Sequence, residues 1–183
     1  SVDKVLNTDR SPLTAIVGGA KVSSKITIIT KLLDKVDHLI IGGGMAYTFI
    51  KAQGGEVGSS LVEDDFIDTA KEILTTAKAK NVSIHLPIDT VVADEFSAEA
   101  NTQVTKTQSI PNGWMGLDIG PEAANAFREV VKNSALILWN GPMGVFEMDK
   151  FQNGTKEIAL AVADATDNGA FSLIGGGDSV AAV

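Results

Sequence analysis

Short apolar runs alternate along the chain with longer segments whose apolar side chains recur every three or four residues. The short runs predict β-strands over residues 13–17, 38–41, 82–86, 135–139 and 170–174. The longer segments predict helices over residues 26–36, 63–80, 121–132 and 148–167. Strands that alternate with helices are typical of a parallel sheet covered by helices on both faces. We therefore predict an α/β protein with three layers, α/β/α.

Two features depart from this regular alternation. Residues 93–120 are polar and rich in turn residues, which indicates a short hairpin excursion from a mainly parallel, Rossmann-like sheet. At the ends of the chain, residues 1–7 resemble the last turns of a helix, and residues 178–183 begin a helix that stops after about one turn. Because so short a helix has too little apolar surface to pack, we expect the chain to be a fragment of a longer protein.

The charge balance and the missing cysteines exclude several classes of protein. The 15 Lys and Arg residues are outnumbered by 23 Asp and Glu residues, which gives a net charge of -8, whereas nucleic-acid binders carry a basic face. Without cysteine there is no disulfide, thiol nucleophile or cysteine-based metal site. His38 and His85 are isolated in the sequence, which argues against a histidine metal cluster. No apolar run reaches about 18 residues and residues 1–15 are too polar for a signal peptide, so we expect a cytoplasmic protein without membrane contacts.

Three of the predicted strands end in glycines. These glycines are Gly18 and Gly19, residues 42–44 and residues 175–177. In a parallel sheet such turns lie on the carboxyl edge, where open α/β folds bind ligands. Glycine lets the backbone approach a ligand closely, and the helix N-termini behind the turns present N–H groups to an anion. One such turn is often only a tight connection, but three on one edge favour a phosphate-bearing ligand.

Two lysines follow the first glycine turn. Lys21 and Lys25 are four residues apart, which places them on one face of a helix in its first turns. The helix macrodipole opposes cations at this end, and no acid occurs between Lys21 and Asp34 to compensate. A bound polyphosphate would explain the pair; the alternative is that both lysines are solvated surface residues.

Asp178 follows the last glycine turn at the start of a predicted helix. The simplest interpretation is a helix N-cap or a first-turn acid. If the two lysines bind phosphates, however, a carboxylate on the same edge is also what a magnesium–nucleotide complex requires, because Mg²⁺ takes one or two carboxylates besides phosphate oxygens and water. Ser179 adds a hydroxyl and an N–H group.

A further segment, residues 139–147, follows the fourth predicted strand. Its Gly-Pro and Gly turns hold an apolar loop that ends in Glu147. One interpretation is a pocket for a nucleobase with Glu147 accepting from ribose hydroxyls; the other is an ordinary connection between a strand and a helix. The P-loop pattern G-x-x-x-x-G-K-[ST], the dinucleotide pattern G-x-G-x-x-G and the protein-kinase catalytic loop are all absent.

Five segments together resemble one known family. They are GGAKV (residues 18–22), IGGGMA (41–46), GLDIGP (116–121), WNGPMGVFE (139–147) and GGGDS (175–179). In their order and spacing they resemble the carboxyl-terminal, nucleotide-binding domain of the phosphoglycerate kinases, and the likeness covers essentially all 183 residues. Five separate motifs in register are highly specific.

The resemblance implies an activity and a domain organisation. Phosphoglycerate kinases reversibly transfer a phosphoryl group between 1,3-bisphosphoglycerate and ADP in glycolysis, giving 3-phosphoglycerate and ATP, with Mg²⁺ bound to the nucleotide. Residues 1–9 correspond to the end of the helix between two hinged domains, and residues 10–183 to a nucleotide-binding domain that is incomplete at its C-terminus. We expect the parent protein to be a monomer.

The resemblance also implies roles for individual residues. It makes Lys21, Lys25 and Gly176 catalytic residues and Asp178 the residue that faces the metal. The residues that it implies for nucleotide binding are Gly19, Ala20, Lys21, Gly43, Gly116, Leu117, Asn140, Pro142, Glu147, Gly176, Gly177, Asp178 and Ser179.

The chain has no counterpart of the family's amino-terminal domain, which holds the phosphoglycerate. We therefore expect this chain alone to bind nucleotide at best weakly and to be inactive. The alternative from another class is a non-catalytic module that binds a nucleotide or another anion on an α/β scaffold. An NAD-dependent oxidoreductase domain is disfavoured because G-x-G-x-x-G is missing.

Overall fold

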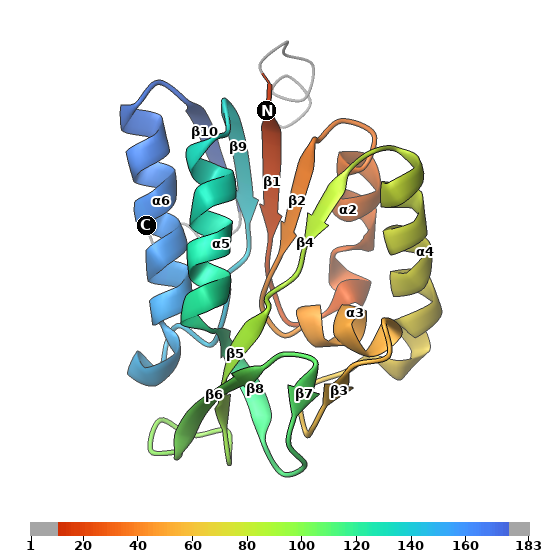
Figure 1. Cartoon of the computed structure of the whole chain (residues 1–183), viewed down its shortest axis with the longest axis vertical. Helices are drawn as coiled ribbons and strands as arrows, with labels where there is room; N and C mark the ends of the chain where they lie inside the picture. Colours follow the sequence, from red (N-terminus) through yellow and green to blue (C-terminus); the bar gives the residue numbers. More distant parts are fainter. Residues whose placement is uncertain (1–10, 176–183) are drawn as a thin grey trace.

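The computed structural model describes residues 11–175 (Figure 1). Its centre is a five-stranded, fully parallel sheet in the order β10–β9–β1–β2–β4. The strands are β1 (Leu13–Val17), β2 (His38–Ile41), β4 (Ser83–His85), β9 (Leu136–Asn140) and β10 (Phe171–Gly175). All five strands predicted from the apolar runs are confirmed. The ends of β1 and β2 are as predicted, and each end of β4, β9 and β10 differs from the prediction by one residue. The predictions for residues 1–9 and for residues 176–183 concern parts of the chain outside the described residues.

Helices cover both faces of this sheet, so the three-layer α/β/α prediction is confirmed. One face carries α2 (Ile26–Leu32), α3 (Ala46–Ala52) and α4 (Ile67–Ala79), and the other carries α5 (Pro121–Lys132) and α6 (Asn153–Asp167) (Figure 1). Side chains alternate between the faces along each strand. In β1, Ala15 and Val17 pack in the core on the α2 side, whereas Ile16 packs in the core beneath α5 and α6.

Three predicted helices are shorter in the structure than in the sequence pattern. The helix predicted over 26–36 ends at Leu32. The chain then forms a turn with backbone hydrogen bonds between residues three apart, from Asp34 to Lys31 and from Lys35 to Leu32. The other two begin late because their first turn is a separate 3₁₀ helix. These turns are η2 (Asp64–Phe66) before α4 and η3 (Asp149–Phe151) before α6; a third, η1 (Val22–Ser24), precedes α2.

Two small sheets lie beyond the carboxyl edge of the central sheet (Figure 1). One is antiparallel, in the order β6–β5–β8, and consists of β5 (Asp89–Ala93), β6 (Thr102–Lys106) and β8 (Met115–Ile119). The other pairs β3 (Glu56–Val57) with β7 (Ser109–Ile110). The predicted hairpin excursion is therefore present, but it begins four residues earlier than residue 93 and has three strands.

Two buried acids tie the antiparallel sheet to helices α5 and α6. Pro121 opens α5, where its missing N–H has no consequence. The carboxylate of Asp89 accepts the next N–H groups, from Glu122 at 3.0 Å and Ala123 at 2.7 Å. Asp118 in β8 acts in the same way on α6, because its Oδ2 accepts the N–H of Gly154 at 2.9 Å. Both acids supply, from another element, the capping acceptors that these helices lack in their own sequence.

Candidate functional site

Strands β1, β2 and β10 end on one edge of the central sheet, as predicted, and the glycine turns after β1 and β2 lie there. The register pairs Val17 with both Ile41 and Asn140, and pairs Asn140 with Gly175. The carboxyl ends of four parallel strands therefore form one row. The third turn is described only up to Gly175.

Strands β1 and β9 are neighbours, but the chain leaves them toward opposite faces of the sheet. Helix α2 follows β1 on one face, and α6 follows β9 on the other. Ligands of open α/β sheets bind at this switch point. The two turns touch here through their backbones: a Cβ on Gly18 would lie 2.6 Å from Gly141 O, and a Cβ on Gly141 would lie 2.0 Å from Gly18 O. Only glycine fits at either position.

Lys25 reaches across the switch point. Its Nζ donates to Asn140 Oδ1 at 2.5 Å, and its Cε lies 3.1 Å from where a Cβ on Gly19 would be. Asn140 ends β9 and Gly19 follows β1, so the Lys25 side chain bonds to one of these segments and passes close to the other. A lysine ammonium has three donor hydrogens, and within residues 11–175 the bond to Asn140 is the one that Lys25 Nζ makes.

Lys21 and Lys25 do not share a helix face, contrary to the prediction. Lys21 has extended backbone angles, φ -133° and ψ 131°, and precedes η1, whereas Lys25 ends η1 and precedes α2. Lys21 is exposed. No acid near in sequence compensates Lys21, but Glu63, remote in the sequence, interacts with it electrostatically.

A cavity of about 540 Å³ opens beside the glycine turns. Its walls combine glycine backbone with apolar side chains, which suits a flat, mostly apolar group such as a nucleobase. Six of the residues predicted to bind nucleotide line it together: Gly19, Ala20, Gly43, Gly116, Leu117 and Pro142. The predicted nucleotide site thus comes from four separate segments of the chain.

Eight further residues line the cavity. Gly44 belongs to the second predicted glycine turn, and Gly144 and Val145 belong to the loop of residues 139–147 that was considered as a base pocket. The sequence did not single out the other five, which are Tyr47, Ser59, Leu61, Phe96 and Met115. Phe96 is 61% exposed, although it is a large aromatic side chain in an otherwise polar segment. An aromatic residue in a polar, turn-rich segment was a signal that the sequence did contain for Phe96. The sequence contained no comparable signal for Ser59 or Leu61.

Three of the described residues predicted to bind nucleotide do not line the cavity: Lys21, Asn140 and Glu147. Asn140 lies instead at the switch point as the partner of Lys25. Glu147 is exposed, two residues beyond the cavity-lining Val145. Its predicted contact with ribose therefore stays a prediction. The predicted phosphate loop, Gly176, Gly177, Asp178 and Ser179, lies outside the described residues.

Burial shifts two ionisable groups behind the cavity. It raises the pKa of the Asp118 carboxyl to about 7, while the N–H donors of Gly154 and Ile119 act in the opposite direction. Burial, followed by the charge of Asp118, raises the pKa of Tyr47, so that its phenol is neutral at neutral pH. A Cβ on Gly116 would lie 2.3 Å from the Tyr47 hydroxyl, which explains the glycine at this point of the wall.

His38 and His85 are not isolated, contrary to the expectation from the sequence. They lie on the adjacent strands β2 and β4, with His38 Nδ1 3.0 Å from His85 Nε2. Burial and then the neighbouring imidazole lower the pKa of His85. Within residues 11–175, no group of three or more His, Cys, Asp or Glu side chains is placed to hold a metal ion.

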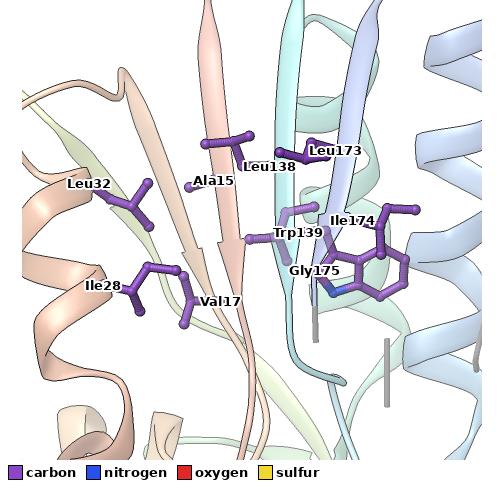
Figure 2. Close-up of a pocket in the computed structure, with 10 residues that line it drawn as sticks. Ala15, Val17, Ile28, Leu32, Leu138, Trp139, Leu173, Ile174 and Gly175 are labelled. Atoms are coloured by element: carbon purple, nitrogen blue, oxygen red, sulfur yellow. The ribbon is translucent and has the colours of Figure 1, made fainter. Parts of the chain in front are cut away.

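A second cavity, of about 240 Å³, lies on the α2 side of the sheet (Figure 2). Figure 2 shows Ile28 and Leu32 of α2 on one side and Leu138 and Leu173 on the other. Its lining residues carry no charge, so this groove is unsuited to a phosphate. As a separate observation, none of the helices in the described part of the chain has the length and apolar character needed to cross a lipid bilayer.

Comparison with solved structures gives the same assignment as the motifs. Phosphoglycerate kinase from Coxiella burnetii is 44% identical, with a TM-score of 0.94 over 99% of this chain. Phosphoglycerate kinase from Pyrococcus horikoshii OT3 is 29% identical, with a TM-score of 0.83 over 99% of this chain. The chain covers only 46% and 45% of those two proteins, so it spans less than half of their length.

The family model of phosphoglycerate kinase matches residues 1–183. The match therefore includes every segment that builds the switch point and the cavity. This chain belongs to the phosphoglycerate kinase family.

Proposed function

We propose that this chain is the nucleotide-binding part of an enzyme that transfers a phosphoryl group between 1,3-bisphosphoglycerate and ADP, giving 3-phosphoglycerate and ATP. The observation that carries the proposal is the position of Lys25. Its side chain bridges the two turns of the switch point and lies against Gly19, which itself lines the 540 Å³ cavity. A nucleoside diphosphate requires a cation at the carboxyl edge of the sheet, for its phosphates, beside a cavity for its base.

In the proposed complex the base occupies the cavity and the phosphates extend toward Lys25. Pro142 and Leu117 both line that cavity and are proposed to contact the base. Lys21 is exposed on the same turn and supplies a second positive charge for the phosphates. Glu147 is proposed to accept hydrogen bonds from the ribose.

The proposed reaction needs no covalent intermediate with the protein. An oxygen of the ADP β-phosphate attacks the phosphorus of the acyl phosphate, the new P–O bond forms, and the bond to the carboxyl oxygen breaks. 3-Phosphoglycerate leaves as a carboxylate, so no proton has to move. The chain contributes positioning and charge neutralisation. Lys25 donates hydrogen bonds to the group in transfer, and Gly176 is proposed to present its N–H to the same group.

Magnesium is proposed to enter as part of the substrate, bound to the phosphates of ADP or ATP. The described residues fit this role for the ion, because they hold no cluster of carboxylates that would bind it without a nucleotide. Mg²⁺ characteristically keeps several waters and uses one or two carboxylates with substrate phosphates. Asp178 is the proposed carboxylate, with Gly177 and Ser179 beside it on the phosphate loop.

The phosphoglycerate is proposed to bind to another part of the parent enzyme, which we expect to be a cytoplasmic monomer. The chain covers less than half of the related kinases. Transfer requires both substrates to be held in line, and the loss of such positioning costs roughly 7–11 kcal/mol. The 183-residue chain alone is therefore proposed to bind nucleotide without turnover.

Calorimetry and a coupled assay on the 183-residue chain test this proposal. We expect weak binding of Mg–ADP and no measurable formation of ATP from 1,3-bisphosphoglycerate. Absence of Mg–ADP binding at millimolar concentration would refute the nucleotide site. Turnover close to that of an intact kinase, after controls for contaminating enzyme, would refute the division of labour.

A further inference from the structure

The loop of residues 58–63 forms one wall of the cavity and is fixed at three points. The Ser59 N–H donates to Trp114 O at 2.8 Å, and Ser60 Oγ accepts the N–H of Gly116 at 2.8 Å. At its end, the Glu63 N–H donates to the hydroxyl of Thr48, a buried residue of α3, at 3.1 Å. The backbone at Glu63 is therefore held in place relative to the cavity.

From this fixed position the Glu63 side chain reaches the lysine turn, residues 21–25. Its Oε1 accepts the N–H of Ser23 at 3.1 Å, and its Oε2 accepts the Ser23 hydroxyl at 2.6 Å. Burial acts to raise the pKa of Glu63, but hydrogen bonds from Ser23 and Val22 and the charge of Lys21 outweigh it, so that the pKa lies below its usual range. Glu63 is thus a carboxylate at neutral pH.

The other hydrogen bonds of the lysine turn mostly stay within it. The Lys25 N–H donates to Val22 O at 2.9 Å, and the Ser24 hydroxyl donates to Lys21 O at 2.9 Å. Such bonds fix the shape of the turn but not its place in the molecule. Its place is set by the buried Val22, by the hydrogen bond from Lys25 Nζ to Asn140 and by the pair of hydrogen bonds that Ser23 donates to Glu63. The pair to Glu63 connects the turn to the loop of residues 58–63.

We propose that Glu63 is a positioning residue for phosphate binding: through Ser23 it holds Lys21 and Lys25 in register with the base cavity. The inference rests on the proposed function, because it needs a nucleotide that spans both places. It means that the same loop forms the wall for the base and sets the position of the charges for the phosphates. Glu63 itself is not expected to touch the nucleotide.

A carboxylate near Lys21 has a second possible effect, which acts in the opposite direction. Its negative charge competes with phosphate for the lysine, so removal of the charge alone would strengthen the binding of ADP. Glu63→Gln separates the two effects. The glutamine can accept the Ser23 N–H through its oxygen and donate to the Ser23 hydroxyl oxygen through its NH₂ group, so both contacts are kept while the charge is lost.

The test compares Mg–ADP with adenosine, which has no phosphate, as calorimetric probes of the 183-residue chain. We expect Glu63→Ala to weaken Mg–ADP about tenfold, a change of ~1.4 kcal/mol, and to leave adenosine within about twofold. Glu63→Gln should bind Mg–ADP at least as tightly as the unchanged chain. Asp64→Asn is the matched control: Asp64 is the adjacent acid, exposed and bonded to Lys51 at 3.0 Å, and its loss should not change the ratio of the two affinities.

Three results would overturn the proposal. The first is an unchanged affinity of Glu63→Ala for Mg–ADP. The second is an equal loss of affinity for both probes. The third is tighter Mg–ADP binding in both Glu63 variants, which would make Glu63 a competing charge. If Glu63→Ala does not fold, Ser23→Ala removes the hydroxyl contact from the other side and should weaken Mg–ADP alone, by about threefold. Failure of the unchanged chain to bind either probe would refute the proposed function instead.

Discussion

The two ends of the candidate site are built on different principles. At the phosphate end, long side chains meet from distant parts of the sequence: Lys25 bonds to Asn140, and Glu63 bonds to Ser23. At the base end, the cavity is formed by glycine backbone and apolar side chains, with Tyr47 and Asp118 buried behind it. The first end is suited to neutralise charge, and the second to select shape.

This difference separates two kinds of sensitivity. A change of charge at the phosphate end should alter the response to phosphate and leave the base cavity intact. A change of backbone or packing should alter the fold of the cavity and affect ADP and adenosine together. Gly43 lies between the ends, since it faces the Gly19 turn and donates its N–H to Met143 O at 3.1 Å.

The largest effect is expected from Lys25→Ala in the intact parent enzyme. Loss of a preorganised donor near the group in transfer should lower kcat by about 100-fold or more and weaken ADP binding by less. Steady-state kinetics and calorimetry measure the two quantities. Lys35→Ala, which changes an exposed lysine after α2, should be neutral. If Lys25→Ala weakened ADP binding but left kcat unchanged, Lys25 would stabilise the bound substrate and the transition state equally and would not contribute to the transfer step itself.

Gly43→Ala tests the contact between the two ends. Gly43 has φ +74°, and a Cβ there would lie 2.5 Å from Gly19 O. Left-handed strain and a collision with rigid backbone should together lower the free energy of unfolding by about 2–4 kcal/mol. Gly54→Ala is the matched control, because Gly54 has φ +91° but open space around it, and should cost only about 1 kcal/mol. Unfolding in urea measures both free energies. If Gly43→Ala and Gly54→Ala lowered the free energy of unfolding equally, the close packing of the Gly43 and Gly19 turns would not contribute to stability.

The smallest effect concerns the base end and depends on pH. Burial raises the pKa of Asp118 from 3.8 to about 7, so the folded state keeps a proton that the unfolded chain loses. Stability from this group is therefore full below about pH 4 and is lost as the pH rises through 7. The stability of the unchanged chain minus that of Asp118→Asn should fall by about 2.5 kcal/mol between pH 5 and 7.5. A constant difference would mean that the carboxyl is ionised throughout this range.

Hydrophobic patterning was sufficient to predict the central layers. Strands β1, β2 and β9 are apolar runs buried on both faces, as parallel strands between helices require. The edge strands β4 and β10 are only partly buried, yet their apolar runs were long enough to identify them. Strand β5 was missed because its first two residues, Asp89 and Thr90, are polar yet buried. Asp89 caps α5, and Thr90 shares a hydrogen bond of 2.6 Å with Thr107. Partners that satisfy such polar groups come from other elements, so local sequence does not identify them.

The glycine turns were likewise predictable, because a strand that ends in glycine places its turn on a known edge of the sheet. The helix face shared by Lys21 and Lys25 was wrong, because η1 and the extended backbone at Lys21 break the α-helical spacing. Neither the approach of Glu63 to Ser23 nor the packing of Leu61 beside Gly44 has a local signal in the sequence. Both depend on how the 58–63 loop crosses the carboxyl edge.

The most direct test of the central claim is residue-resolved nuclear magnetic resonance of the 183-residue chain, titrated in parallel with Mg–ADP and with adenosine. We expect both ligands to shift the amide signals of Gly116 and Leu117, which line the cavity. Only Mg–ADP should also shift the signal of Lys25, which does not line the cavity. Shifts that avoid the cavity, or the same shifts at Lys25 with adenosine, would contradict a nucleotide that spans the two ends.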